Sequence, residues 1–160
     1  MARYVPEGTV EVYFVATVAD AAAPTSTELN AGTDITGAMA GDLVMPFAGS
    51  TADAADMSSR FNKTAPGDFG GAEGTFTIHR ELASGDDTAY TTLTRGTTGY
   101  LAVANRGLTT PGTWAIGDEV DLWPIEVLSR ENQYARNQTL RAQIAMAITD
   151  VPTEEFSLVA

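Results

Sequence analysis

The sequence contains no cysteine, one lysine (Lys63) and one histidine (His79). The absence of cysteine excludes a disulfide scaffold and thiolate metal sites. Only 9 basic residues stand against 21 acidic ones, which gives a formal net charge of −12. A chain of this charge does not hold a phosphate backbone, because that binding depends on Lys and Arg side chains that release counterions.

Long apolar runs are also missing. No segment approaches the roughly 18 consecutive apolar residues that a membrane-spanning helix needs. Residues 1–12 lack the apolar core and small-residue cleavage site of a secretory signal, so we expect a protein made in the cytoplasm. The length of 160 residues, with 44% hydrophobic and 19% charged residues, favours one globular domain.

The strongest pattern lies in residues 117–149. Its second part alternates strictly and places five apolar side chains on one face, namely Leu140, Ala142, Ile144, Met146 and Ile148. A period of two predicts a strand with one buried face. Its first part alternates up to Pro124, which interrupts the pattern, and a polar linker joins the two parts. We therefore predict a long antiparallel hairpin with a polar second face.

Further strands are predicted at residues 9–19 and 75–82, and at 98–105, whose apolar run indicates cover on both sides. Residues 33–39 predict a weaker, short strand. A helix is predicted at residues 84–94, and residues 25–32 fit either one helical turn or a loop. The fold class is therefore mainly β (α+β), a β-barrel or sandwich of about six or seven strands with one flanking α-helix.

Three segments lack a regular pattern. Residues 1–8 form an arm that ends at Pro6 and Gly8. Residues 41–74 are rich in small residues and predict only weak strands at 43–47 and 56–61. This stretch is either an ordinary loop or an excursion that becomes ordered against another subunit. Residues 153–160 form an apolar tail that we expect to dock on a neighbour.

No sequence motif indicates a catalytic centre. Nucleophilic triads, phosphate-binding loops, dinucleotide fingerprints and zinc motifs are absent from the sequence, and paired carboxylates for an acidic hydrolase are only a weak signal. His79 is predicted to face outward from its strand without a catalytic partner. Trp114 and Trp123 fit either a sugar-binding platform or core packing.

Two groups of acidic residues remain. Asp118, Glu119 and Asp121 lie at the start of the long hairpin and fit either a calcium site or a solvated acidic edge. The spacing of a calcium-binding loop is absent from them. The pair Asp86–Asp87 is interpreted as charge at the positive end of the predicted helix.

The order of these segments resembles a known family. The segments concerned are APTSTELNAGTDITG, FNKTAPGDFGG, TFTIHRE, GYLAVANRG and GDEVDLWPIEVLSRENQ, followed by TLRAQIAMAITDVPTEE. Together they are similar to the major tail tube proteins of long-tailed phages with flexible tails, in particular the short versions from phages of actinobacteria. The resemblance implies a structural virion protein of the tail, without enzyme activity or cofactor. Its subunits would form hexameric rings that stack into a hollow tube with a continuous inner β-barrel, through which DNA passes without specific binding.

The resemblance also implies roles for particular segments of a single domain spanning residues 1–160. Residues 1–8, 41–74 and 153–160 would bridge adjacent rings. Seven residues are the predicted contacts between subunits: Tyr4, Val5, Phe47, Phe61, Phe69, Phe156 and Leu158. Four acidic residues are the predicted lumen-facing set: Asp118, Glu119, Asp121 and Glu126. The expected partners are copies of the chain itself, the tape measure protein, the tail terminator and baseplate proteins, and no membrane.

Two other interpretations remain open. A carbohydrate-binding β-sandwich would use Trp114 and Trp123 together with acidic loops. Another virion part, such as a tail terminator or a head decoration protein, would have a similar size and equally lack catalytic residues. Copy number in the virion distinguishes these parts from a tail tube subunit.

Overall fold

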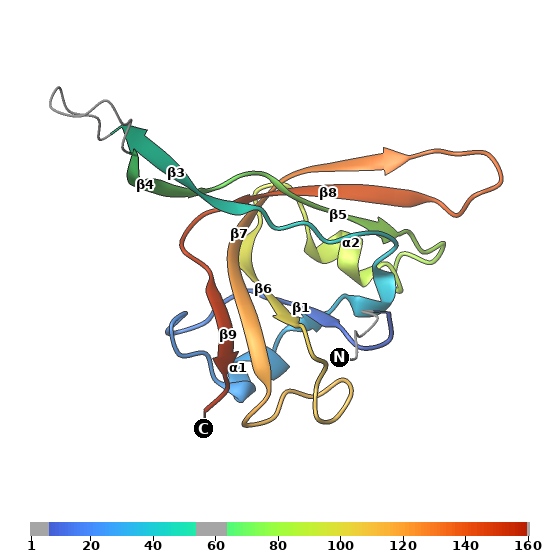
Figure 1. The fold of residues 1–160 in the computed structure, drawn as a ribbon. Coiled ribbons are helices and arrows are strands. Elements are labelled where there is room, and N and C mark those ends of the chain that lie inside the picture. Colours follow the sequence, from blue (N-terminus) through green and yellow to red (C-terminus); the bar gives the residue numbers. More distant parts are fainter. Residues whose placement is uncertain (1–6, 54–63, 160) are drawn as a thin grey trace, which may run out of the picture.

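The computed structural model describes residues 7–53 and 64–159. Most strands belong to one antiparallel sheet, which bends over on itself (Figure 1). The strands are β1 (Glu11–Val15), β2 (Thr33–Asp34), β3 (Phe47–Asp53), β4 (Thr64–Gly71), β5 (Gly74–His79), β6 (Thr98–Ala104), β7 (Glu119–Gln133), β8 (Arg141–Ile148) and β9 (Thr153–Ser157). The helices are α1 (Ser26–Asn30), α2 (Thr88–Thr92) and the short 3-10 helix η1 (Thr36–Ala38). The mainly-β fold class is confirmed, and the described residues contain more strands than the six or seven expected and two short α-helices in place of one.

Strand β7 connects the two halves of the sheet. The strand order is β2-β1-β6-β7-β8-β5, and β9 also pairs with β7. On the edge away from β6, β7 pairs first with β9, up to Leu122, and then with β8, from Ile125 onward. Pro124 lies at this change of partner, so the strand continues through it. A proline fits there because it has no N–H group to donate to the sheet, and its carbonyl accepts a 3.0 Å hydrogen bond from Thr149 N.

A β-bulge between Val127 and Ser129 then bends β7. At the bulge, Leu128 is an extra residue with no partner on β8. Such an extra residue increases the local bend and twist of a strand. The end of β7, with β8 and β5, therefore folds over the half made by β1, β6 and the start of β7. The main hydrophobic core fills the space between these halves: Val12, Phe14, Ile35, Phe76, Ile78, Ala89, Leu93, Leu101, Val103, Trp123, Ile125, Val127, Ala142, Ile144 and Met146.

A second core covers the outer face of β1, β6 and the start of β7. Its members are Tyr13, Val15, Leu29, Ala102, Ala104, Trp114, Val120, Leu122 and Leu158. Helix α1 closes this core, and the Asn30 side chain holds Trp114 by two 2.9 Å hydrogen bonds, one to its carbonyl and one from its N–H. The two cores cover β1 and β6 on both faces, as the sequence predicts for residues 98–105.

Helix α1 begins at a capping box. Thr25 accepts a hydrogen bond from Glu28 N, while the Glu28 carboxylate accepts one from Thr25 N, which satisfies N–H groups that a helix start otherwise leaves unpaired. The helical alternative for residues 25–32 is therefore correct. A hydrogen bond from Ala19 N, and then those from Thr25, hold the pKa of the Glu28 carboxyl below its ordinary value.

Two predicted elements are wrong in extent. The helix expected at residues 84–94 is only α2, because residues 83–86 form a turn and Asp87 directs its carboxylate to Arg80 instead of capping the helix. The strand expected at residues 33–39 ends after β2, where the Asp34 carboxylate accepts a hydrogen bond from Thr36 N and the chain enters η1.

The prediction of an irregular stretch at residues 41–74 is also wrong. Strands β3 and β4 form an antiparallel hairpin that projects from the body of the molecule (Figure 1). Glycine, alanine and serine hide this pairing from the sequence pattern because they carry no apolar alternation. The strand expected at residues 43–47 is reduced to a bridge from Val44 to Thr75, and the one expected at 56–61 lies outside the described residues.

The C-terminal segment belongs to the fold of its own chain. Strand β9 pairs with the start of β7, and Leu158 is buried in the second core with 1% of its surface exposed. The expected docking of residues 153–160 on a neighbour is therefore wrong for β9 and Leu158. Strand β9 finds its partner within the chain because β7 would otherwise leave an unpaired edge at Glu119–Leu122.

Truncation of this anchor should destabilise the monomer. We expect Leu158→Ala to lower the free energy of unfolding by about 2–4 kcal/mol, because it removes a buried side chain and leaves a cavity. Urea unfolding followed by circular dichroism measures this change. Leu82→Ala is the matched control, since Leu82 is fully exposed, and an equal effect of both variants would contradict the placement of Leu158.

Candidate assembly surface

The bent half of the sheet has one face that neither core covers. We call it the open face, and it carries the side chains that alternate with the buried ones on β5, β8 and the end of β7. They are Thr75, Thr77, His79, Glu126, Ser129, Glu131, Gln133, Arg141, Gln143, Ala145 and Ala147. None of them belongs to either hydrophobic core. Figure 1 shows α2 beneath this half of the sheet and none of the described helices or strands above it.

The side chains of the open face are mostly polar or small. Its strands are in register, so that His79, Arg141 and Gln133 form one row across the sheet, and Thr77, Gln143 and Glu131 form the next. Most of these side chains are half-buried or exposed. A polar face adds little to the stability of a monomer, because it buries little apolar surface. Such a face is expected where a sheet forms the wall of a water-filled space.

The same half of the sheet has two unpaired lateral edges. On the edge of β7 that faces away from β8, pairing with β6 and the turn before it ends at Val127. From Leu128 to Gln133 this edge therefore has no partner among the described residues. At the other side, residues 39–44 run along β5 with bridges from Met39 and Val44. The outer edge of this segment likewise has no strand partner in the described part of the chain. Unpaired N–H and C=O groups on such edges favour pairing with another chain.

Two hairpins leave the body in opposite directions in the view of Figure 1. The β3–β4 hairpin carries Phe69, which is 69% exposed and stacks on Phe47 with ring centroids 6.4 Å apart. The β7–β8 hairpin ends in a loop with the exposed Tyr134 and Leu140. Exposed aromatic side chains on projecting hairpins suit contacts with other subunits.

The base of the β3–β4 hairpin lies close against the body. A Cβ atom added at Gly71 would come within 2.5 Å of the Ile148 Cβ, so the backbone of the hairpin packs directly on β8. The absence of a side chain at residue 71 therefore sets the distance between the hairpin and the body.

Helix α2 is fixed below the bent half by a polar cluster. Arg80 forms a 2.6 Å ion pair with the buried Asp87 and donates a hydrogen bond to Asn132. The guanidinium groups of Arg80 and Arg130 lie 3.3 and 4.1 Å from the centroid of the Tyr90 ring. The buried Asp87 thus pairs with a half-buried arginine, which corrects its interpretation as helix-end charge. The cluster joins α2 to the underside of β7, through Arg130 and Asn132, without using the open face.

Asp118 does not face a lumen. It is buried with 4% of its surface exposed, and its carboxylate accepts hydrogen bonds from Thr109 N, Thr109 Oγ1 and Ala115 N at 2.6–3.0 Å. Burial alone raises the pKa of this carboxyl, but the hydrogen bonds outweigh burial and hold the pKa below its ordinary value. Asp118 is therefore a structural residue that closes the loop before β7.

The other three predicted lumen residues separate in the structure. Glu119 pairs with Arg106 at 3.2 Å, and Asp121 accepts hydrogen bonds from Asn105 Nδ2 and, at 2.7 Å, from Glu155 N. Both lie on the half of β7 beside β9, away from the open face. Only Glu126 belongs to the open face, where it lies opposite Ala147 of β8.

The predicted contact residues also separate. Phe69 is exposed on its hairpin, whereas Phe47 and Phe156 are partly buried against the cores of their own chain. Tyr4, Val5 and Phe61 lie outside the described residues. Leu158 is withdrawn as a contact because its own chain buries it. The sequence missed Leu128 and Tyr134, whose exposure depends on the bulge and on the reach of the hairpin.

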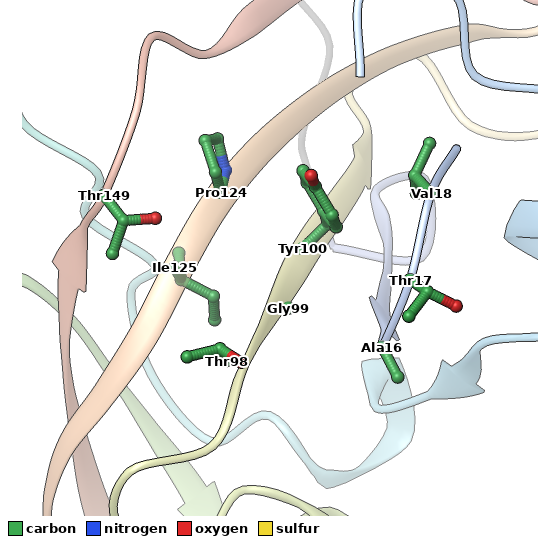
Figure 2. Close-up of a pocket in the computed structure, with 9 residues that line it drawn as sticks. All are labelled: Ala16, Thr17, Val18, Thr98, Gly99, Tyr100, Pro124, Ile125 and Thr149. Atoms are coloured by element: carbon green, nitrogen blue, oxygen red, sulfur yellow. The ribbon is translucent and has the colours of Figure 1, made fainter. Parts of the chain in front are cut away.

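The structure offers little for catalysis or sugar binding. A pocket of about 310 Å³ is lined by nine residues, none of which is charged: Ala16, Thr17, Val18, Thr98, Gly99, Tyr100, Pro124, Ile125 and Thr149 (Figure 2). Trp114 and Trp123 are 2% and 8% exposed, so the sugar-platform interpretation is wrong and core packing is correct. His79 lies on the open face, with Nδ1 3.1 Å from Thr139 Oγ1.

The acidic cluster at the start of β7 is equally unsuited to calcium. Donors of the chain occupy both carboxylate oxygens of Asp118. Within residues 7–53 and 64–159, no group of three or more His, Cys, Asp or Glu side chains is placed to hold a metal ion. No helix in that part of the chain is long and apolar enough to cross a membrane.

The buried Asp118 should make stability depend on pH. Its folded-state pKa lies below the unfolded value of about 3.9, so its contribution is complete above that value and is lost as the pH falls through the folded pKa. We expect Asp118→Asn to lower the free energy of unfolding by about 1–3 kcal/mol near pH 7, and the difference from the unsubstituted protein should shrink below about pH 4. Urea unfolding at several pH values measures both, with the exposed Asp68→Asn as the control. A difference that does not change with pH would contradict this role.

A likeness in fold is found to a chain of the tail of an empty gene transfer agent particle, refined with C6 symmetry. The two share 16% sequence identity over 78% of this chain and 88% of that chain, with a TM-score of 0.54. A chain of the SPP1 tail tube shares 10% identity over 93% of this chain and 78% of that chain, with a TM-score of 0.51.

At these identities the likeness concerns the fold alone. No curated protein matches the chain in sequence. The family model described as "Phage tail tube protein" matches residues 1–160. Its members are structural components of the virion tail. The chain belongs to the phage tail tube protein family.

Proposed function

We propose that the chain polymerises into stacked hexameric rings whose open faces together line the bore of a phage tail tube. The observation that supports this most strongly is the bent half of the sheet, which combines a polar open face with an unpaired strand edge on each side. Six-fold symmetry is taken from the gene transfer agent tail, which was refined with C6 symmetry. The fold of this chain is compatible with that arrangement.

The two edges differ, and this difference sets the kind of contact. The edge of β7 from Leu128 to Gln133 belongs to one side, and residues 39–44 belong to the other. Pairing one edge with the other edge of a neighbour is a head-to-tail contact, which closes into a ring when the rotation per subunit fits. The sheet then continues from subunit to subunit as a closed barrel without free edges.

Stacking of rings would use the parts that project from the body. The β3–β4 hairpin, with Phe69 exposed, and the loop at the end of the β7–β8 hairpin reach beyond the sheet (Figure 1). Residues 1–8 are a further proposed bridge between rings. The tape measure protein, the tail terminator and baseplate proteins remain proposed partners, and DNA is proposed to pass through the bore without specific binding or catalysis.

Electron microscopy of the purified protein tests this function directly. We expect rings or tubes at high concentration, and we expect Leu128→Lys to block their formation while leaving the monomer folded. A lysine at a sheet edge opposes pairing with another strand, and Leu128 is 41% exposed on the free edge. Circular dichroism confirms folding, and sedimentation measures the loss of assembly.

Leu82→Lys is the matched control, because it introduces the same charge at a fully exposed leucine outside the sheet. It should assemble as the unsubstituted protein does. Assembly of Leu128→Lys to the same extent would contradict the proposed lateral contact. A protein that stays monomeric at all concentrations, including in the presence of tail initiation proteins, would contradict the tube itself.

A further inference from the structure

We propose that the polar cluster around α2 fixes the angle between the two lateral edges of a subunit, and thereby decides whether a row of subunits closes into a ring. We call it the α2 cluster, and its members are Arg80, Asp87, Tyr90, Arg130 and Asn132. The inference rests on the proposed function, because it takes these edges to pair between subunits. It concerns the underside of the bent half and not the open face.

The far end of the bent half extends beyond the main hydrophobic core. The outermost members of that core on the three strands are Val127 of β7, Ala142 of β8 and Ile78 of β5. From there toward the β7–β8 loop, no residue of these strands belongs to the core. The twist between neighbouring strands varies widely among sheets. Backbone pairing alone therefore leaves the angle between the outer edges of this end variable.

The α2 cluster takes the place of the core at this end. Helix α2 lies beneath it (Figure 1), and Arg130 and Asn132 alternate along β7 with the open-face residues Ser129 and Glu131. Arg130 Nη1 donates a 2.6 Å hydrogen bond to the carbonyl of Tyr90, which lies in the last turn of α2, where helix carbonyls commonly lack an intrahelical partner. The free edge of β7 is thus connected directly to α2.

Arg80 connects the other side of the sheet to the same helix. It directly follows β5, and its backbone N–H donates a 2.9 Å hydrogen bond to the carbonyl of Leu140, just before β8. Its guanidinium reaches Asn132 of β7 at 2.8 Å and Asp87 at 2.6 Å. The side chain therefore crosses beneath β8 and links β5 with β7. The β8 residue opposite Asn132 is Ala142, whose small side chain leaves room for this crossing.

Tyr90 is the centre of the α2 cluster. The guanidinium carbons of Arg80 and Arg130 lie 3.3 and 4.1 Å from the centroid of its ring, within the range of cation–π contacts. The ring also packs against the main core, which fixes its position. Two guanidinium groups and the carboxylate of Asp87 leave a charge of 2 − 1 = +1. The aromatic ring stabilises this remaining positive charge without a second carboxylate.

The two lateral edges lie on the two strands that the α2 cluster connects. One edge is β7 from Leu128 to Gln133, and the other is the segment of residues 39–44 that runs along β5. The cluster therefore holds both edges at one angle. Head-to-tail contacts close into a ring only when the rotation per subunit fits, and they otherwise give open filaments. Loss of the cluster should consequently reduce ring closure more than it reduces the stability of the monomer.

Tyr90→Leu tests this inference, because Tyr90 lies on α2 and on neither lateral edge. The substitution removes the aromatic face but keeps an apolar side chain against the core. We expect circular dichroism to show a folded monomer. We expect electron microscopy to show a yield of closed rings lower by about tenfold, the scale of effect of losing a partly buried cation–π contact. Open arcs, or rings of irregular diameter, should appear instead.

Two further variants separate positioning from folding. Tyr90→Phe keeps both the ring and the backbone carbonyl, so it should close rings as the unsubstituted protein does. Arg130→Met removes one cation–π contact and the hydrogen bond to α2 but leaves the ion pair of Arg80 with Asp87 in place. It should reduce the yield of closed rings as Tyr90→Leu does.

The matched control is Leu158→Ala. It lowers the stability of the monomer through the second core, whereas Tyr90 packs against the main one. All variants are compared at a temperature at which each is folded by circular dichroism. Leu158→Ala should then form closed rings in the yield of the unsubstituted protein.

Four results would overturn the inference: a normal yield of rings from Tyr90→Leu and Arg130→Met, failure of Tyr90→Phe to close rings, an equal loss of rings in Leu158→Ala, or unfolding of both Tyr90→Leu and Arg130→Met. The last result would make the α2 cluster part of the folding core. If the unsubstituted protein forms neither rings nor tubes, the proposed function falls as well. If it forms them and the variants depart from expectation, only the role of the α2 cluster falls.

Discussion

One strand has to serve both halves of this sheet, and the bend in β7 makes this geometry possible. Its 15 residues pair with β6 along one edge and with β9 and then β8 along the other. Pro124 lies where the partner changes, and the bulge at Leu128 turns the strand. A straight β7 would leave the two halves side by side, and the apolar residues of β8 and β5 would have nothing to pack against.

The bend divides the molecule into a complete half and an incomplete half. The half around β1 and β6 has both faces covered by hydrophobic cores and receives β9 on the edge of β7 that faces away from β6. The half around β8 has one covered face, one polar face and unpaired lateral edges. The main core between the halves stabilises the monomer, while the polar face and the unpaired edges of the second half remain available for contacts between subunits.

Acidic residues that are neighbours in sequence acquire different roles in this fold. Asp118 closes a buried loop through three hydrogen bonds, Asp121 holds the backbone of β9, and Glu119 pairs with Arg106. Most of the negative charge of the chain is consequently not on the open face. Net charge describes how the protein behaves as a whole, whereas the register of the strands decides which charges the open face carries.

The sequence alone determined the class of fold and the strands with a clear period of two. Residues 140–148 alternate because one face of their strand lies in the main core, and residues 98–105 run apolar because both faces of theirs are covered. In both segments the local pattern reports burial directly. The resemblance to tail tube proteins likewise followed from the order of segments. Only the tertiary structure decided how residues 41–74 and 153–160 pair. Strands β3 and β4 have no apolar alternation to reveal their pairing, and β9 pairs with a part of β7 that is distant in sequence. The same holds for Asp118 and Leu128, since burial of a carboxylate and exposure of a leucine both follow from where the sheet bends.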